Sequence, residues 1–309
     1  MPENGPDQPL TVMAPAKVNL ALEVLGRRPD GYHEIRTVMQ AVSLFDELEF
    51  RSAPTDGVEL ECDAPGVPGD ERNLVVQAAE LLRERADVER GVRVGLRKSI
   101  PAGGGLGGGS SDCAVTLLAL NQFWDLQLPV EALAEVAAGL GSDIPFFLYG
   151  GTSLCEGRGE KVRPVPAEGE IHYALALPEM SVSTADVYAG WQNGLTSRDS
   201  ASNNVLEALA CGDVGLLTAA LHNDLQEKAF ELHDGLRSLH EDLERVTEPV
   251  GLQRWLLAGS GSSFFAPSES ERAVRRAARL VRAELDVPCV AAHSLPAWNG
   301  RILLLTRWR

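Results

Sequence analysis

Lysine is scarce in this sequence, and positive charge as a whole is in short supply. Only four of the 28 basic residues in the 309-residue chain are lysines, and 44 acidic residues leave a formal net charge of −16. Proteins that bind nucleic acid through its phosphates normally carry a basic domain or stripe. The charge therefore argues against a nucleic-acid partner, and an anionic substrate would have to be bound by a few local cations.

Long apolar runs and paired cysteines are also missing. No apolar stretch approaches the ~18 residues of a membrane-spanning helix, and the first residues lack the pattern of a signal peptide. We therefore expect a cytoplasmic protein without a membrane partner. The five cysteines are widely spaced and no histidine pair has metal-ligand spacing, which predicts free thiols and no protein metal site.

The residues that are present have an ordinary globular composition, arranged in two differently patterned halves. Hydrophobic residues make up 44% and charged residues 23%, and at ~150 residues per domain the length suggests two domains. The first half alternates strand-like and helix-like segments, and the second half is typical of an antiparallel α+β layer. The Pro-, Gly- and Glu-rich residues 163–170 are the expected hinge, which predicts domains 1–163 and 164–309.

Hydrophobic periodicity predicts the individual elements. The expected strands of the first half are 11–25 (one long strand or a pair interrupted near Pro15), 47–51, 58–62 and 92–96; those of the second half are 171–177, 254–258, 263–266, 287–292 and 301–306. The expected helices are 73–85 capped by Asn73, 111–123, 129–140, a short one from Asp143, 202–210, 213–221, 223–246 and one ending near 285 that begins with a Ser268/Glu271 capping box.

The expected helix 223–246 has leucines at heptad spacing. A single helix with one apolar face on the core explains this spacing, and a coiled coil that forms a dimer is the alternative.

The strongest local feature is a glycine-rich loop with the sequence P-A-G-G-G-L-G-G-G-S-S-D at residues 101–112. Glycines allow successive backbone N–H groups to converge on one point, and the apolar helix that follows presents its positive end to the same place. The hydroxyl groups of Ser110 and Ser111 could contact a phosphate oxygen or a magnesium ion. This pattern predicts a phosphate-binding loop; a flexible linker is the alternative, and the helix directly after the loop argues against it.

Three better-known phosphate sites fit this loop poorly. The glycine spacing matches G-x-G-x-x-G, but a dinucleotide-binding fold needs a strand after the helix, where another helix is expected. The loop has no terminal G-K-[ST] of a Walker motif, and the H-R-D and D-F-G motifs of protein kinases are absent. A dinucleotide oxidoreductase is therefore a weak alternative.

Four other segments contain polar residues in patterns that are ambiguous one at a time. A-P-A-K-V-N-L places Lys17 and Asn19 on one face of a strand, and R-R-P-D-G-Y-H forms a polar turn that ends in Tyr32 and His33. In G-S-D-I-P, Asp143 alone could be a simple helix N-cap. G-S-G-S-S, from residue 259, alone could be a turn between strands.

In order and spacing, these segments together resemble the 4-diphosphocytidyl-2-C-methyl-D-erythritol kinases, within the superfamily named for galactokinase, homoserine kinase, mevalonate kinase and phosphomevalonate kinase. The resemblance extends from Ala14 to Phe265. It implies an α+β, two-domain GHMP kinase fold. In that fold an N-terminal ribosomal-protein-S5-like ATP-binding domain and a C-terminal ferredoxin-like α/β domain have the active site in the cleft between them.

The resemblance also implies a reaction. The γ-phosphoryl group of ATP, accompanied by Mg²⁺, is transferred to the 2-hydroxyl of a small molecule, the cytidyl diphosphate-linked methylerythritol, in the non-mevalonate route to isoprenoid precursors. A monomer or weak homodimer is expected. Some superfamily members add an acidic magnesium ligand, and this sequence offers no clear counterpart.

Roles follow for residues that match the family's motifs. Asp143 is the implied general base and Lys17 its cationic partner, as phosphoryl transfer requires positioning and charge neutralisation. For the substrate, the resemblance implies contacts from Asn19, Tyr32, His33, Asp143, Thr184, Tyr188, Gly259, Ser260 and Gly261, with the two tyrosines stacking on cytosine. For ATP, it implies contacts from Asn73, Leu74, Lys98, Pro101, Gly103, Gly104, Gly105, Leu106, Gly107, Gly108, Gly109, Ser110 and Ser111. Asn223 and Asp224 match the family's N-D-L pattern without an assigned role.

Two alternatives on the same fold remain. The first is another GHMP kinase, of the homoserine or mevalonate type, against which the D-G-Y-H turn and Tyr188 argue. The second is a catalytically idle nucleotide-binding regulator, against which the presence of both Lys17 and Asp143 argues. If the protein is a kinase, an anionic substrate requires a small positive cleft on the acidic surface. The cations available for this cleft are Lys17, Arg27, Arg28, Arg36 and Lys98.

Overall fold

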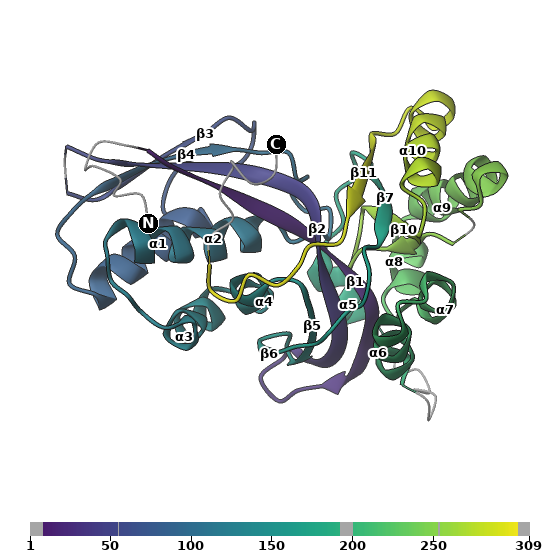
Figure 1. Ribbon diagram of the computed structural model, residues 1–309, viewed down its shortest axis with the longest axis horizontal. Coiled ribbons are helices and arrows are strands. Elements are labelled where there is room, and N and C mark those ends of the chain that lie inside the picture. The colour runs from purple at the N-terminus through teal and green to yellow at the C-terminus, as the bar shows by residue number, and fades with distance from the viewer. Residues whose placement is uncertain (1–8, 55, 192–199, 253, 302–309) are drawn as a thin grey trace.

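Two very long antiparallel strands run through the molecule and connect its two halves (Figure 1). The computed structural model describes residues 9–54, 56–191, 200–252 and 254–301. Strand β1 (Leu10–Arg27) pairs with β2 (His33–Ser52) over almost their whole length. The expected interruption near Pro15 is a register shift between Pro15 and Ala16 within one continuous strand.

The first sheet is built around this pair. Its strand order is β3-β4-β2-β1-β8, with β5 pairing to the other half of β2 and β6 to β5. The added strands are β3 (Val58–Cys62), β4 (Val92–Arg97), β5 (Thr152–Gly157), β6 (Lys161–Pro164) and β8 (His222–Asn223). Because β8 comes from the second half of the chain and pairs in parallel with β1, the two halves share one sheet.

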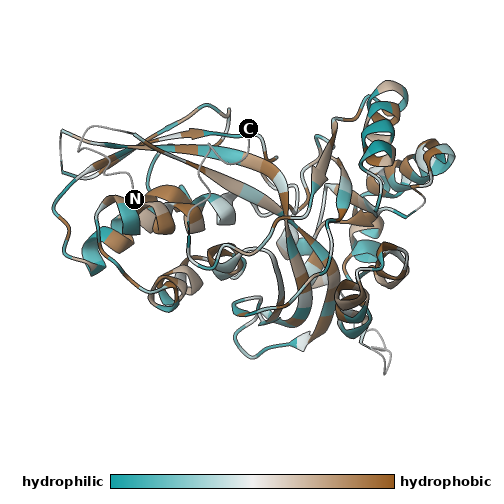
Figure 2. Cartoon of the chain, viewed as in Figure 1, coloured by the Kyte–Doolittle hydropathy of each residue, from teal (hydrophilic) through white to brown (hydrophobic). Residues whose placement is uncertain are grey.

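Four helices cover one face of this sheet: α1 (Leu74–Arg85), α2 (Gly108–Phe123), α3 (Val130–Leu140) and α4 (Ile144–Tyr149) (Figure 1). Asn73 caps α1 as predicted, since its Oδ1 accepts a hydrogen bond from the Val75 N–H at 2.9 Å. Helix α2 is buried on almost all sides, which explains its continuous apolar sequence (Figure 2). It begins at Gly108, so the last glycines of the loop already form its first turn.

The second sheet is antiparallel, as predicted, with the order β11-β7-β10-β9. Its strands are β7 (His172–Ala176), β9 (Leu256–Leu257), β10 (Phe264–Ser268) and β11 (Cys289–His293). Side chains alternate along the strands: Tyr173 and Phe265 face a core shared with β1, α6 (Ala201–Cys211) and α7 (Val214–Ala220). Ala174 and Phe264 face a core with α8 (Gln226–Leu232), α9 (Asp234–Thr247) and α10 (Glu271–Leu285).

The expected single helix 223–246 is wrong. His233 has an extended backbone (φ −140°, ψ 88°) that separates α8 from α9, and Asn223 belongs to β8. The residues at heptad spacing therefore belong to two separate helices, each of which packs its own apolar side chains on the core. This segment does not form the single long helix that the coiled-coil alternative requires.

The start of α10 also differs from the prediction. Ser268 ends β10, and the N-cap is Ser270, whose hydroxyl accepts a hydrogen bond from the Ala273 N–H. The short 3-10 helix η1 (Glu248–Val250) and α5 (Thr184–Gly190) complete the described elements, and none of the described helices is long and apolar enough to cross a membrane.

The chain returns to the first half at its C-terminal end, as the yellow segment toward α4 shows (Figure 1). The indole N–H of Trp298 donates to the Phe147 carbonyl at 2.9 Å, and Ala297 bridges to Gly150. Almost all of the expected strand 301–306 lies outside the described residues. The segment after β11 thus connects the second half of the chain to the C-terminal end of α4 in the first half.

Candidate active site

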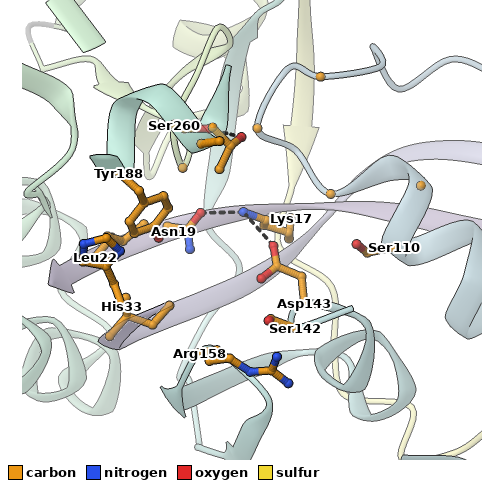
Figure 3. Close-up of a pocket in the computed structure, with 18 of the residues that line it drawn as sticks. Lys17, Asn19, Leu22, His33, Ser110, Ser142, Asp143, Arg158, Tyr188 and Ser260 are labelled. Atoms are coloured by element: carbon orange, nitrogen blue, oxygen red, sulfur yellow. Dashed lines mark hydrogen bonds and ion pairs between the residues drawn. The ribbon is translucent and has the colours of Figure 1, made fainter. Parts of the chain in front are cut away.

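A cavity of about 990 Å³ lies at the junction of the two halves. Its walls come from β1, the turn into β2, the glycine-rich loop, the residues before α4, the β5–β6 turn, α5 and the loop before β10 (Figure 3). Segments from across the sequence therefore meet in one place, which the fold alone could bring about.

Lys17 and Asp143 face each other across this cavity. The Lys17 Nζ lies 3.6 Å from Asp143 Oδ2 and donates a 2.6 Å hydrogen bond to Asn19 Oδ1 (Figure 3). The Lys17 side chain is 4% exposed, whereas the Asp143 side chain is 33% exposed and accessible to a ligand. Asp143 does occupy the N-cap position of α4, but its side chain accepts no capping hydrogen bond from the helix.

The backbone holds Lys17 against the glycine-rich loop. Lys17 follows the register shift in β1, and its N–H donates to the Leu106 carbonyl at 2.9 Å. Gly107 has a φ of 73°, and a Cβ atom there would lie 3.1 Å from Lys17 Cγ and 2.9 Å from the Phe147 ring. A side chain at residue 107 would therefore displace the lysine.

The glycine-rich loop also contacts the loop before β10. The Ser263 N–H donates to the Gly104 carbonyl at 3.1 Å, and a Cβ atom on Gly105 would stand 1.9 Å from the Ala258 carbonyl oxygen. Asn223, which had no assigned role, braces the second loop, because its Nδ2 donates to the carbonyls of Leu257 and Gly259. The two loops thus form one rigid wall of the cavity.

A geometry that favours an anion lies at the start of α2. Gly108, Gly109 and Ser110 line the cavity at the N-terminal end of this 16-residue helix, where backbone N–H groups and the helix dipole favour an anion. Ser111 lies behind them, and among the described residues its buried hydroxyl has no hydrogen-bond partner.

Aromatic side chains form the opposite end of the cavity. The His33 ring lies 5.2 Å from the Tyr188 ring and 6.0 Å from the Trp191 ring, centroid to centroid. Burial, together with the Arg27 charge, lowers the pKa of His33, which favours the neutral imidazole. Tyr32 stands apart on the rim, 54% exposed, with the Arg158 guanidinium 4.8 Å from its ring centroid.

Most of the predicted site residues meet in the cavity. These are Lys17, Asn19, Tyr32, His33, Leu74, Pro101, Gly103, Gly104, Gly105, Gly107, Gly108, Gly109, Ser110, Asp143, Thr184, Tyr188, Gly259 and Ser260. Five are not among its lining residues, namely Asn73, Lys98, Leu106, Ser111 and Gly261. Lys98 departs most from expectation, because its ammonium group is buried between Asp46 and Asp112.

Sequence reasoning missed Ser142, Arg158 and Trp191. Arg158 is flanked by glycines in the β5–β6 turn, and that E-G-R-G-E pattern was the one local signal for an exposed cation. Lys17, Arg27 and Arg158 are the cations that line the cavity, against the single carboxylate of Asp143. The described lining is therefore positive, as expected on an acidic chain.

Arg28 and Arg36, two further cations predicted for the cleft, form ion pairs and do not line the cavity. Arg28 pairs with Asp30 and Glu34, and Arg36 lies 3.7 Å from Glu156 and donates hydrogen bonds to Ser200 and Asn203. Among the described residues, no group of three or more His, Cys, Asp or Glu side chains is placed to hold a metal ion.

Known proteins are similar to this chain in sequence and in fold. A family model of the GHMP kinases N terminal domain matches residues 73–151. The 4-diphosphocytidyl-2-C-methyl-D-erythritol kinase of Bacillus cytotoxicus is 40% identical over 257 residues, 83% of this chain and 87% of the relative. The enzyme of the same name from Brevibacillus brevis is 39% identical over 294 residues, which are 95% of this chain and 99% of the relative.

Solved structures agree. A crystal structure of 4-(cytidine 5'-diphospho)-2C-methyl-D-erythritol kinase superposes with a TM-score of 0.77 at 35% identity, covering 92% of this chain and 99% of that one. Homoserine kinase from Cytophaga hutchinsonii gives 0.76 at 19% identity, over 98% and 100% of the chains. The latter likeness shows the shared fold alone.

Proposed function

The chain belongs to the 4-diphosphocytidyl-2-C-methyl-D-erythritol kinase family and is a kinase of the GHMP fold, and from this we propose that it phosphorylates the 2-hydroxyl of 4-diphosphocytidyl-2-C-methyl-D-erythritol. The reaction serves the non-mevalonate route to isoprenoid precursors. The observation that carries the proposal is the Lys17–Asp143 pair, 3.6 Å apart, in one cavity with the glycine-rich loop.

The transfer needs one proton acceptor and a positive environment. Asp143 accepts the proton of the substrate hydroxyl, whose oxygen forms a bond to the γ-phosphorus of ATP while the bond from that phosphorus to the ADP oxygen breaks. Lys17 offsets the charge that develops between them. Asn19 holds Lys17 in place, because Oδ1 accepts from the ammonium group and Nδ2 donates to Thr37 Oγ1 at 2.9 Å.

The loop residues would hold the triphosphate of ATP. Gly108, Gly109 and Ser110 present backbone N–H groups and one hydroxyl at the start of α2. A magnesium ion bound with ATP neutralises phosphate charge. Among the described lining residues Asp143 supplies a single carboxylate, and the other oxygen donors are neutral, which fits a metal that would be held mainly by phosphate and water oxygens.

The opposite end of the cavity fits a nucleobase and a diphosphate. Tyr188, Tyr32 and His33 supply aromatic faces, and Arg27 and Arg158 supply positive charge beside them. Thr184 Oγ1 lies 2.7 Å from Ser260 Oγ, so α5 and the second loop approach the substrate together. In this proposal residues 1–163 bind ATP, and residues 164–309 contribute Thr184 and Tyr188 to the substrate.

The decisive experiment measures ADP release with a panel of acceptors: the cytidyl substrate, CDP, homoserine and mevalonate. We expect turnover with the cytidyl substrate and none with homoserine or mevalonate. These two small acids have no nucleobase that could stack on the aromatic side chains at one end of the cavity. Turnover with homoserine or mevalonate and none with the cytidyl compound would replace this proposal by the related kinase, and ATP binding without any turnover would support the regulator.

We expect Tyr188→Ala to raise KM for the cytidyl substrate about tenfold to a hundredfold, because stacking contributes ~1–3 kcal/mol per base. The affinity for ATP, measured by calorimetry, should change little, because the loop at the other end binds it. Tyr188→Phe is the matched control: it keeps the ring and should retain most of the substrate affinity. Equal losses for substrate and ATP in Tyr188→Ala would show that the stacking assignment is incorrect.

A further inference from the structure

The side-chain amide of Asn223 is buried between three backbone groups. Its Nδ2 donates hydrogen bonds to the carbonyls of Leu257 at 2.8 Å and Gly259 at 2.7 Å, and its Oδ1 accepts one from the Leu225 N–H at 2.9 Å. Two carbonyl acceptors and one N–H donor leave a single orientation for the amide. Asn223 is 8% exposed and is not among the residues that line the cavity. It therefore supports the wall of the cavity from behind.

Asn223 is also fixed to the strand that carries Lys17. Strand β8, which contains Asn223, pairs in parallel with β1 at Ala21 and Leu22. The next residue, Asp224, donates its N–H to the Leu22 carbonyl at 3.0 Å. Because Lys17 lies on the same strand β1, the Asn223 side chain connects the strand that carries the lysine to the loop before β10.

The loop before β10 in turn covers the Lys17 ammonium group. A Cβ atom on Gly259 would lie 3.5 Å from Lys17 Nζ and 3.6 Å from Asn19 Oδ1, so the backbone of Gly259 faces both groups without a side chain between them. The same ammonium group donates to Asn19 Oδ1 and lies 3.6 Å from Asp143 Oδ2 (Figure 3). It is therefore confined by Asn19, Asp143 and the Gly259 backbone. Asn223 holds the last of these in place.

We propose that Asn223 is a positioning residue for the phosphoryl transfer, because it holds the loop before β10 against Lys17 and so fixes the ammonium group at the reacting centre. The inference rests on the role of Lys17 in the proposed function. A lysine side chain is flexible along its four-carbon stem, and its charge stabilises a transition state best where it is oriented before the reaction begins. When the Gly259 carbonyl loses its donor, the loop is free to move away and the ammonium group loses one of its supports.

The first test is the variant Asn223→Asp. It keeps the shape of the side chain and the acceptor for the Leu225 N–H, but it replaces the donor by an oxygen that repels two carbonyls. We expect kcat with the cytidyl substrate to fall about tenfold to a hundredfold, since displacements near 1 Å at a reacting centre cost about 10²-fold in rate. Binding of a non-hydrolysable ATP analogue, measured by calorimetry, should change little, because Gly108, Gly109 and Ser110 lie apart from this contact, at the start of α2.

Asn121→Asp is the matched control. Asn121 braces the segment between α2 and α3 in a similar way: its Nδ2 donates to the Leu128 carbonyl at 3.0 Å, and its Oδ1 accepts from the Leu128 N–H at 2.9 Å. It lies outside the cavity. Both variants should lower Tm, because each leaves a backbone carbonyl without its donor, but Asn121→Asp should keep the kcat of the wild type. An equal kcat in Asn223→Asp and Asn121→Asp would overturn the proposal.

The scarcity of lysine makes a direct measurement of the ammonium group possible. The chain has four lysines, so lysine labelled with ¹³C at Cε gives four methylene resonances, of which the Lys17 resonance is the one lost in Lys17→Arg. We expect Asn223→Asp to shift this resonance and to leave those of Lys98 and Lys161 in place, whereas Asn121→Asp should move none of them. An unmoved Lys17 resonance in Asn223→Asp would overturn the proposal.

Asn223→Ala keeps the proposal testable if Asn223→Asp does not fold. It removes both donors without burying a charge, and the same shift of the Lys17 resonance and the same fall in kcat are expected. A shifted resonance with an unchanged kcat would overturn the catalytic consequence and contradict the proposed role of Lys17. A wild type that does not turn over the cytidyl substrate would instead contradict the proposed function, while the Lys17 resonance would still test the contact with the loop.

Discussion

Asp143→Asn should lower kcat by about 10²–10⁴-fold, the usual contribution of a general base. The asparagine keeps the size and shape of the side chain opposite Lys17 but cannot accept the proton of the substrate hydroxyl. The carboxylate makes no capping hydrogen bond to α4, so the substitution removes no hydrogen bond from the helix. Binding of an ATP analogue, measured by calorimetry, should persist, because the substitution leaves the proposed ATP-binding residues of the loop unchanged.

The control for this variant is Asp125→Asn, which makes the same chemical change at an exposed residue outside the cavity. Its positive φ of 56° is one that asparagine adopts readily, so kcat should equal that of the wild type. A turnover of Asp143→Asn close to the wild-type value would show that another group accepts the proton. Loss of both turnover and nucleotide binding would indicate that Asp143 supports the site structurally.

Gly105→Ala should damage both stability and activity. A Cβ atom at this residue would stand 1.9 Å from the Ala258 carbonyl oxygen, and the backbone has a φ of +76° that alanine adopts only with strain. Backbone strain and overpacking together should cost about 2–5 kcal/mol of the free energy of unfolding. Because the two loops must separate, and displacements near 1 Å at a reacting centre cost about 10²-fold in rate, we expect kcat/KM to fall at least that far.

Gly66→Ala is the matched control for backbone strain. Gly66 has a φ of +80°, but nothing lies within 4 Å of the position that its Cβ atom would occupy. This variant should lose only the ~1–2 kcal/mol of strain and keep its kcat/KM, since Gly66 lies outside the cavity. Thermal unfolding and steady-state kinetics on the two variants measure the difference. Similar losses in both would mean that the contact between the loops matters little.

Local rules predicted much of the fold because several elements depend on neighbouring residues alone. The cap of Asn73 on α1 is set within one turn of helix, and it was expected. The register shift at Pro15 also has a local cause, since proline cannot donate a hydrogen bond to the strand ladder. Such features could be predicted because the interactions behind them span only a few residues.

The wrong predictions concern segments whose conformation is decided by distant partners. The heptad pattern from Asn223 indicated one helix. Instead Asn223 pairs with β1, and its side chain donates a hydrogen bond to the loop before β10. The extended backbone of His233 then separates α8 from α9. Hydrophobic periodicity indicates which residues are buried in a core, but it does not indicate whether they belong to one helix or to two.

The sequence by itself determined the family, the glycine-rich loop and the pairing of a lysine with an acid, because these depend on residue types in a fixed order. Only the tertiary structure decided where each cation acts. Lys17 and Lys98 both lie in recognisable motifs, yet Lys17 faces Asp143 in the cavity while Lys98 is buried between Asp46 and Asp112. The physical reason is that the charge environment of a side chain comes from residues far away in the sequence, which only the folded chain brings within a few ångströms.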